Sequence, residues 1–288
     1  MKIGIGLPNT VRGAAGDVMV EWARRAEARG FSTVATIGRV AFPSYADLIA
    51  LAAAAGATSR IALMTDILLG PLHNPAMLAK DVASLDALSG GRFTLGAAVG
   101  GRQDDYAVTG VGYEDRGKRW DAALELMHQV WRGEAPAGTD QPIAPPPTNG
   151  DRVPVLIGGT SDATLRRVAK WGAGWTAGGA PPEAVAPFAE RVRAAWTEAG
   201  REGEPRMAAL LYFALGDNAE EGARRSLEDY YAFAGPYAKM AAEHAAKTHE
   251  AIVGARTAFE KVGVDELIYF PAIAELEQVD MLAEEVGL

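Results

Sequence analysis

Short runs of consecutive apolar residues alternate along this chain with longer stretches whose apolar positions recur at helical spacing. Glycine, proline or asparagine separates most of the runs from the stretches that follow. Uninterrupted apolar strands are typical of parallel sheets that are buried on both faces. The runs predict strands at 2–7, 31–37, 61–69, 93–99, 153–157, 174–177, 207–215 and 265–270.

Strand and helix patterns in regular alternation predict an α/β fold, a single (β/α)8 TIM barrel over residues 1–288. Two connections are unusually long: a proline-rich loop at 133–152 and a helical stretch at 219–262, broken at Gly235-Pro236. We interpret them as insertions after strands four and seven that help to roof a pocket. Residues 44–47 resemble a capping box that opens an alanine-rich helix.

Composition narrows the possible partners. The absence of cysteine excludes disulfides and thiolate chemistry, and a net charge of -9 argues against nucleic acid or anionic membrane. No apolar run approaches the ~18–20 residues that span a bilayer, and the N-terminus lacks a signal-peptide pattern. We therefore expect a cytoplasmic protein. No dinucleotide, Walker, metalloprotease or nucleophile-elbow motif occurs, and the four histidines are scattered, so a metal enzyme is disfavoured.

The turn after the fifth strand is the main candidate binding element. Gly158 and Gly159 allow close approach of a ligand, and Thr160 or Ser161 is suited to cap the next helix. Such a helix N-terminus can bind phosphate. The same pattern also occurs in turns that bind nothing.

Five further side chains are predicted near the same face. Asp66 interrupts an apolar strand, where a carboxylate is costly unless it is bonded or useful. Arg39 follows strand two, and Arg102 and Tyr106 follow strand four. Tyr212 lies in strand seven. Each also has a purely structural interpretation. Asp66 can be an acid at a strand end, Arg39 a surface arginine, and Tyr212 a core tyrosine. Arg102 and Tyr106 can belong to a solvated loop.

Several segments together resemble the bacterial luciferase-like family of flavin- and deazaflavin-dependent oxidoreductases. The matching segments extend over nearly the whole chain in the family's order. They are Met1–Pro8, 29–31, Thr65–Ile67, His73–Ala76, Leu78–Lys80, Ser89–Phe93, Leu95–Gly96, Glu114–Gly117, Trp131–Gly133, Val155–Thr160 and Gly263–Leu267.

The resemblance implies a barrel that holds a flavin-type ring in its mouth. It places a non-prolyl cis peptide at Asp66-Ile67, against the ring, and phosphate contacts at Gly158, Gly159 and Thr160. It also implies a homodimer, for which the helices near 46–55 and 75–88 offer a surface. Many members carry an acid–histidine pair after strand two, but this chain has Gly38 and Arg39 there.

We therefore predict a monooxygenase that uses reduced FMN and oxygen to oxidise a small organic substrate. A separate flavin reductase would supply the reduced FMN. Asp66 and Arg39 are the candidate catalytic residues of the monooxygenase, and Arg102, Tyr106 and Tyr212 its candidate substrate contacts. The alternative is an oxidoreductase that transfers hydride with the deazaflavin F420, which an F420 reductase would supply in its reduced form. A lower-ranked alternative is a non-catalytic flavin-binding protein. A phosphate-binding aldolase or isomerase would need a lysine or glutamate near a strand end, and no lysine is so placed.

Overall fold

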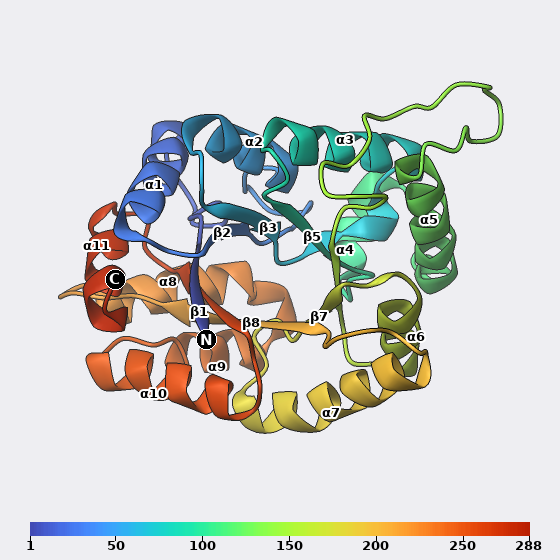
Figure 1. The fold of residues 1–288 in the computed structure, drawn as a ribbon. Helices are drawn as coiled ribbons and strands as arrows, with labels where there is room; N and C mark the ends of the chain where they lie inside the picture. The colour runs from blue at the N-terminus through green and yellow to red at the C-terminus, as the bar shows by residue number, and fades with distance from the viewer.

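A closed parallel barrel forms the centre of the molecule, as the computed structural model of residues 1–288 shows (Figure 1). Every strand pairs in parallel with its neighbours, and pairing of β3 with β5 closes the ring. The predicted (β/α)8 barrel is therefore confirmed. Its strands are β1 (Lys2–Gly6), β2 (Thr33–Thr36), β3 (Ala62–Thr65), β4 (Leu68–Leu69), β5 (Phe93–Ala98), β6 (Val155–Gly158), β7 (Gly174–Thr176), β8 (Arg206–Phe213) and β9 (Glu266–Pro271).

An outer ring of helices covers the barrel (Figure 1). Further helices are inserted after β4, β5 and β8. The ring consists of α1 (Gly16–Arg29), α2 (Asp47–Ala57), α3 (Pro75–Leu88), α5 (Arg116–Trp131), α6 (Asp162–Trp171), α7 (Pro182–Glu198), α10 (His249–Lys261) and α11 (Glu277–Val286). The others are η1 (Gly70–Leu72), α4 (Gln103–Thr109), α8 (Ala219–Tyr230), η2 (Ala232–Ala234) and α9 (Pro236–Glu243).

Three local predictions differ from the structure. The strand expected at 61–69 is split into β3 and β4, and a cis peptide joins Asp66 to Ile67 between them. The predicted capping box is wrong: Ala46 is the N-cap of α2, and the Ser44 hydroxyl donates to the carbonyl of Arg39 instead. The polar loop after strand four contains the unpredicted α4, because a short helix gives little periodicity to detect.

Two apolar layers stabilise the barrel. The larger layer lies between strands and helices and buries five tryptophans, while the smaller one fills the barrel interior and continues beneath α8. At the N-terminal end, Glu266 pairs with Arg206 at 2.5 Å and accepts from the hydroxyls of Ser32 and Thr33 at 2.6 Å. The interior is therefore plugged at this end, which leaves the C-terminal end of the strands to receive a ligand. None of the helices is both long and apolar enough to cross a bilayer.

Candidate functional site

Asp66 lies at the end of β3, with its carboxyl group turned into the barrel. It is 1% exposed, and its Oδ1 accepts a hydrogen bond from the Thr176 hydroxyl at 2.7 Å. Its other oxygen is buried without a partner. Burial raises the pKa of Asp66 to about 6, although the Thr176 hydrogen bond works in the opposite direction. The sequence-predicted Asp66 is thus a poorly solvated acid beneath the barrel mouth.

Three glycines surround the peptide between Asp66 and Ile67. The amide of Gly38 donates to the Ile67 carbonyl at 3.2 Å. A Cβ atom on Gly96 would collide with the carbonyl of Thr65, and one on Gly158 would lie 3.4 Å from the Ile67 side chain. The absence of side chains at these positions lets the strand ends close around this peptide. Ile67 and Gly158, which were predicted to bind one cofactor, are therefore in contact range of each other.

The turn from β6 into α6 has the features of an anion site. Gly159 has a φ of 106°, which favours glycine, and its carbonyl accepts from the Trp175 indole at 2.8 Å. Ser161 is the N-cap of α6, as predicted, and accepts from the amide of Thr164. The amides of Thr160 and Ser161 donate to no acceptor in the protein. An anion placed here would meet free N–H groups and the positive end of the helix dipole.

Arg39 is held inside the structure rather than extended toward a ligand. Its side chain is 6% exposed, pairs with Asp104, and donates to the Tyr230 carbonyl at 3.0 Å. Its guanidinium also lies over the rings of Phe42 and Phe233. These contacts tie the loop after β2 to α4 and to the segment after β8.

Arg102 belongs to the same group of side chains. It donates to the Tyr230 hydroxyl at 3.3 Å, and its guanidinium lies 4.9 Å from the centre of that ring. It also lies over Tyr231 and Phe233. We call this set the arginine–aromatic cluster: Arg39, Arg102, Phe42, Tyr230, Tyr231 and Phe233. The hydroxyls of Tyr231 and Tyr212 are 2.8 Å apart, which links Tyr212 to the cluster.

Tyr106 lies apart from the cluster. It is 1% exposed, and its hydroxyl donates to the carbonyl of Val99. Its ring packs edge-on against Tyr113 at 5.2 Å between centroids. Tyr106 therefore holds the loop after β5 against the barrel, and its predicted substrate contact stays a prediction.

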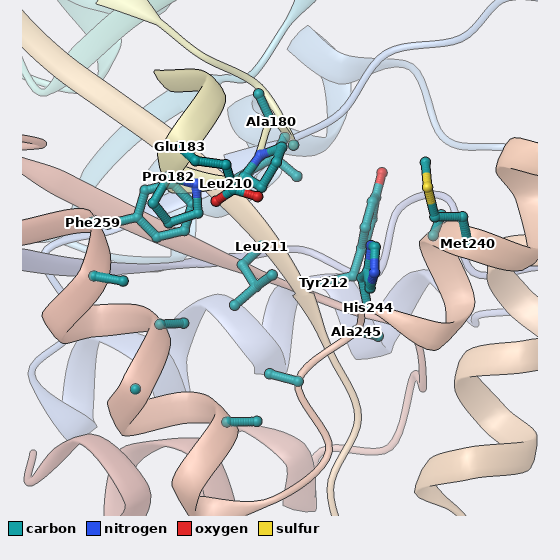
Figure 2. Close-up of a pocket in the computed structure, with 18 of the residues that line it drawn as sticks. Ala180, Pro182, Glu183, Leu210, Leu211, Tyr212, Met240, His244, Ala245 and Phe259 are labelled. Carbon is teal, nitrogen blue, oxygen red and sulfur yellow. The ribbon is translucent and has the colours of Figure 1, made fainter. Parts of the chain in front are cut away.

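A cavity of about 540 Å³ opens beside the end of β8. Figure 2 shows Tyr212, His244 and Met240 on one side of it, Pro182 and Phe259 on the other, and Leu211 between them. Its walls are mainly apolar and come from β8, α9, α10 and the loop before α7. Of the predicted site residues only Tyr212 lines it.

The sequence did not reveal this cavity. Its α10 wall consists largely of small residues, which carry no recognisable chemical motif. They are Ala251, Gly254, Ala255 and Ala258. Only the tertiary structure places them around the same cavity as Tyr212. The structure contains no group of three or more His, Cys, Asp or Glu side chains that could hold a metal ion.

Comparisons with known proteins agree with this architecture. An uncharacterized protein of Mycobacterium tuberculosis is 31% identical over 208 residues, which cover 62% of this chain and 71% of the relative. Three solved structures have the same fold, each at 21% identity or less. Monooxygenase RslO1 from Streptomyces bottropensis aligns with a TM-score of 0.82 over 100% of this chain and 98% of its own. An F420-dependent secondary alcohol dehydrogenase, in complex with an F420–acetone adduct, aligns with a TM-score of 0.79 over 100% and 99%.

The third structure is a type II Baeyer–Villiger monooxygenase, the oxygenating constituent of 3,6-diketocamphane monooxygenase from Pseudomonas putida, in complex with FMN. It aligns with a TM-score of 0.73 over 99% of this chain and 98% of its own. This fold therefore carries FMN in one protein and F420 in another. The sequence model described as luciferase-like monooxygenase matches residues 1–270 of this chain. The protein belongs to the luciferase-like monooxygenase family.

Proposed function

We propose that this protein is a flavin-dependent monooxygenase that uses reduced FMN and oxygen on a small, largely apolar organic substrate. The observation that carries the proposal is the turn from Gly158 to Ser161. Its free amides lie at the carboxyl end of the barrel, one strand away from the Asp66–Ile67 peptide. FMN has a phosphate at one end and a planar ring at the other. The turn would bind the phosphate, and the ring would lie beside the Asp66–Ile67 peptide.

The protein's own residues would bind, orient and shield the reactants. Gly159, Thr160 and the start of α6 would hold the phosphate, while Ile67 and Gly158 would support the ring. Bound FMN, once reduced, supplies the electrons with which one atom of O₂ enters the substrate and the other leaves as water. Because the ring would lie above Asp66, this carboxyl group would face it in a water-poor environment, where charge is costly.

The cavity beside Tyr212 supplies the best place for the substrate. About 540 Å³ is within the range of small-molecule sites, and the mainly apolar walls favour an uncharged hydrocarbon-rich molecule. Tyr212 would orient a polar group of the substrate through its hydroxyl. Through the arginine–aromatic cluster, Arg39 and Arg102 would hold the loop after β2, α4 and the segment after β8 in place beside the site.

The second candidate is hydride transfer with F420. It is suggested by the fold shared with the F420-dependent dehydrogenase, which aligns with a TM-score of 0.79. F420 would use the same turn and the same peptide. A separate reductase would supply the reduced cofactor in either case.

A parallel fluorescence titration with FMN and with F420 tests the proposal. Binding of FMN, followed by oxygen-dependent conversion in a screen of apolar substrates, would support the monooxygenase. Binding of F420 alone would replace it with the hydride-transfer enzyme, and binding of neither would contradict both.

A matched pair of variants tests the turn itself. Gly159→Ala places a side chain at a φ of 106°, and Gly13→Ala does so at 81° in an exposed loop. Each is expected to cost about 1–2 kcal/mol of stability. Only Gly159→Ala should weaken cofactor binding, by about tenfold, because only this turn carries the phosphate. Equal affinity in the two variants would remove the turn from the site.

A further inference from the structure

Asp47, the first residue of α2, directs its carboxyl group toward the end of β2. A Cβ atom on Gly38 would collide with Asp47 Oδ2. The carboxylate thus occupies the space that a side chain at position 38 would need. Gly38 donates to the Ile67 carbonyl at 3.2 Å, so this carboxyl group lies next to the peptide against which the ring is proposed to bind.

No charged side chain pairs with this carboxyl group. Asp47 Oδ1 is buried and takes part in no hydrogen bond, although the residue as a whole is half-buried. Asp47 does not cap α2, because the N-cap is Ala46 and no side chain caps the helix. The nearest strand-end arginine, Arg39, is committed to Asp104 and Tyr230. A buried, unpaired carboxylate is costly, so the site favours the neutral acid.

The surroundings of Asp47 keep a proton within reach of neutral pH. Burial raises the pKa of Asp47 to about 7, and the nearby Thr36 hydroxyl opposes this only in part. Tyr230 of α8 faces it and is itself buried, with a raised pKa, so it stays neutral. By contrast, Asp66 has one oxygen engaged by Thr176 inside the barrel.

We propose that Asp47 is the proton-exchanging residue of this site, reaching the barrel mouth through the space left open by Gly38. The inference rests on the proposed function. When a new bond forms at a carbonyl carbon of the substrate, the electron pair of the breaking C=O π bond moves onto the oxygen. That oxygen takes the proton from Asp47 in its acid form, and the O–H bond of the carboxyl group breaks. The resulting carboxylate recovers a proton from water before the next turnover. General acid catalysis of this kind contributes about 10²–10⁴ in rate.

The competing explanation is that Asp47 only stabilises the N-terminus of α2. An acid in a first turn interacts favourably with the helix dipole, but the dipole would lower its pKa. Asp17 offers a matched control, because it lies in the first turn of α1 and is exposed. Asp17→Asn and Asp47→Asn each remove one first-turn charge, and only the latter removes a proton site at the barrel mouth.

The first measurement uses the protein without cofactor. Urea unfolding of the unaltered protein, Asp47→Asn and Asp17→Asn is followed at several pH values from 4 to 8. A raised pKa means that the folded state binds the proton more tightly, so stability is highest at low pH and falls as the pH rises toward 7. The unaltered protein and Asp17→Asn should lose stability over this range relative to Asp47→Asn. Parallel curves for all three would overturn the inference.

The second measurement is the dissociation constant of FMN and of F420 at pH 6 and pH 8.5. A ring that covers Asp47 removes water from its carboxyl group and favours the neutral form. The dissociation constant of the cofactor should therefore rise between pH 6 and pH 8.5 in the unaltered protein. This rise should be about fivefold larger than the rise measured for Asp47→Asn. The ratio to the variant cancels the titration of the cofactor itself.

The outcomes separate the inference from the proposed function. Cofactor binding whose pH dependence is the same in Asp47→Asn would overturn the role of Asp47 and leave the function standing. Binding of neither cofactor by the unaltered protein would overturn the proposed function, and the proton role with it, even if Asp47 titrates as expected. Once a substrate is identified, Asp47→Asn should lower kcat by about 10²-fold or more, and retention of full kcat would contradict the inference.

Discussion

Asp66 and Asp47, two acids near the carboxyl ends of β3 and β2, differ in how they are buried. Asp66 is enclosed by the barrel and bonded to Thr176, whereas Asp47 enters from a helix and has no partner for Oδ1. In both, removal from water disfavours the carboxylate more than nearby groups favour it. The two groups therefore hold protons close to neutral pH, a property common at functional sites.

The substitution Asp66→Asn tests the burial of this carboxyl group. Because burial raises the pKa of Asp66 to about 6, the unaltered protein should lose stability as the pH rises from about 4 to about 6. The asparagine keeps an acceptor for Thr176 but carries no charge. The free energy of unfolding of Asp66→Asn, relative to that of the unaltered protein, should increase by on the order of 2 kcal/mol over that range and then level off.

Chemical unfolding at pH 4.5 and pH 7.5 measures this difference. Asp140→Asn is the control, because Asp140 lies exposed in the loop at 133–152. Its removal should leave the stability profile as it is. An Asp66→Asn curve parallel to that of the unaltered protein would mean that the carboxyl group is hydrated in solution.

At the scale of elements, the arginine–aromatic cluster connects three segments that are distant in sequence. Arg39 follows β2, Arg102 precedes α4, and Tyr230 ends α8. Asp105 of α4 completes the connection, since its Oδ1 accepts from the amides of Val40 and Ala41 at 2.8 and 2.6 Å. The arrangement of α4, α8 and the loop after β2 therefore depends on buried charges that face each other.

Arg39→Ala should destabilise the protein by about 3 kcal/mol. It removes the buried cation between α4 and α8 and leaves the fully buried Asp105 without its neighbouring positive charge. Hydrogen exchange should increase in 228–236, where the chain loses its anchor. Unaltered stability would show that the cluster does not hold α4 and α8 in place.

Arg12→Ala is the matched control. Arg12 also reaches α8, through Asp229 at 2.8 Å, but its side chain is 59% exposed. An ion pair in contact with water contributes little to stability, so this variant should unfold almost like the unaltered protein. Turnover of the two variants would then test Arg39 as a candidate catalytic residue.

At the scale of the whole molecule, one side of the helical ring exposes large apolar side chains. Ile49 on α2, and Met77 and Leu88 on α3, are 72%, 57% and 79% exposed, and α2 lies beside α3 (Figure 1). An apolar surface of this kind is typical of association sites. It coincides with the surface that the family resemblance suggested for a homodimer.

We predict that Ile49→Glu and Met77→Glu together convert a dimer into a monomer, because the charges would be buried at the interface. Light scattering after size exclusion measures the mass directly. Val253→Glu on α10 is the control, since Val253 is exposed on another side of the ring. A monomeric unaltered protein, or a dimer that survives both charges, would contradict the predicted interface.

Local patterns were enough to predict much of this architecture. Asn74 followed by Pro75 is a local signal for a helix start, and the Asn74 side chain accepts from the amides of Ala76 and Met77 at the N-terminus of α3. Ser161 likewise caps α6 as expected. These signals are readable because a cap and its helix are adjacent in sequence. The capping box at Ser44 failed because a contact with Arg39 competed for the same hydroxyl.

By itself, therefore, the sequence determined the barrel, the glycine turn after β6 and the family, since each depends on periodicity or on neighbouring residues. Only the tertiary structure decided that Arg39 is buried among aromatic rings, that α10 lines a cavity with β8, and that Asp47 fills the space beside Gly38. The physical reason is that these arrangements depend on packing between segments distant in sequence. Which acid meets the barrel mouth is set by the docking of a helix, and no local pattern encodes it.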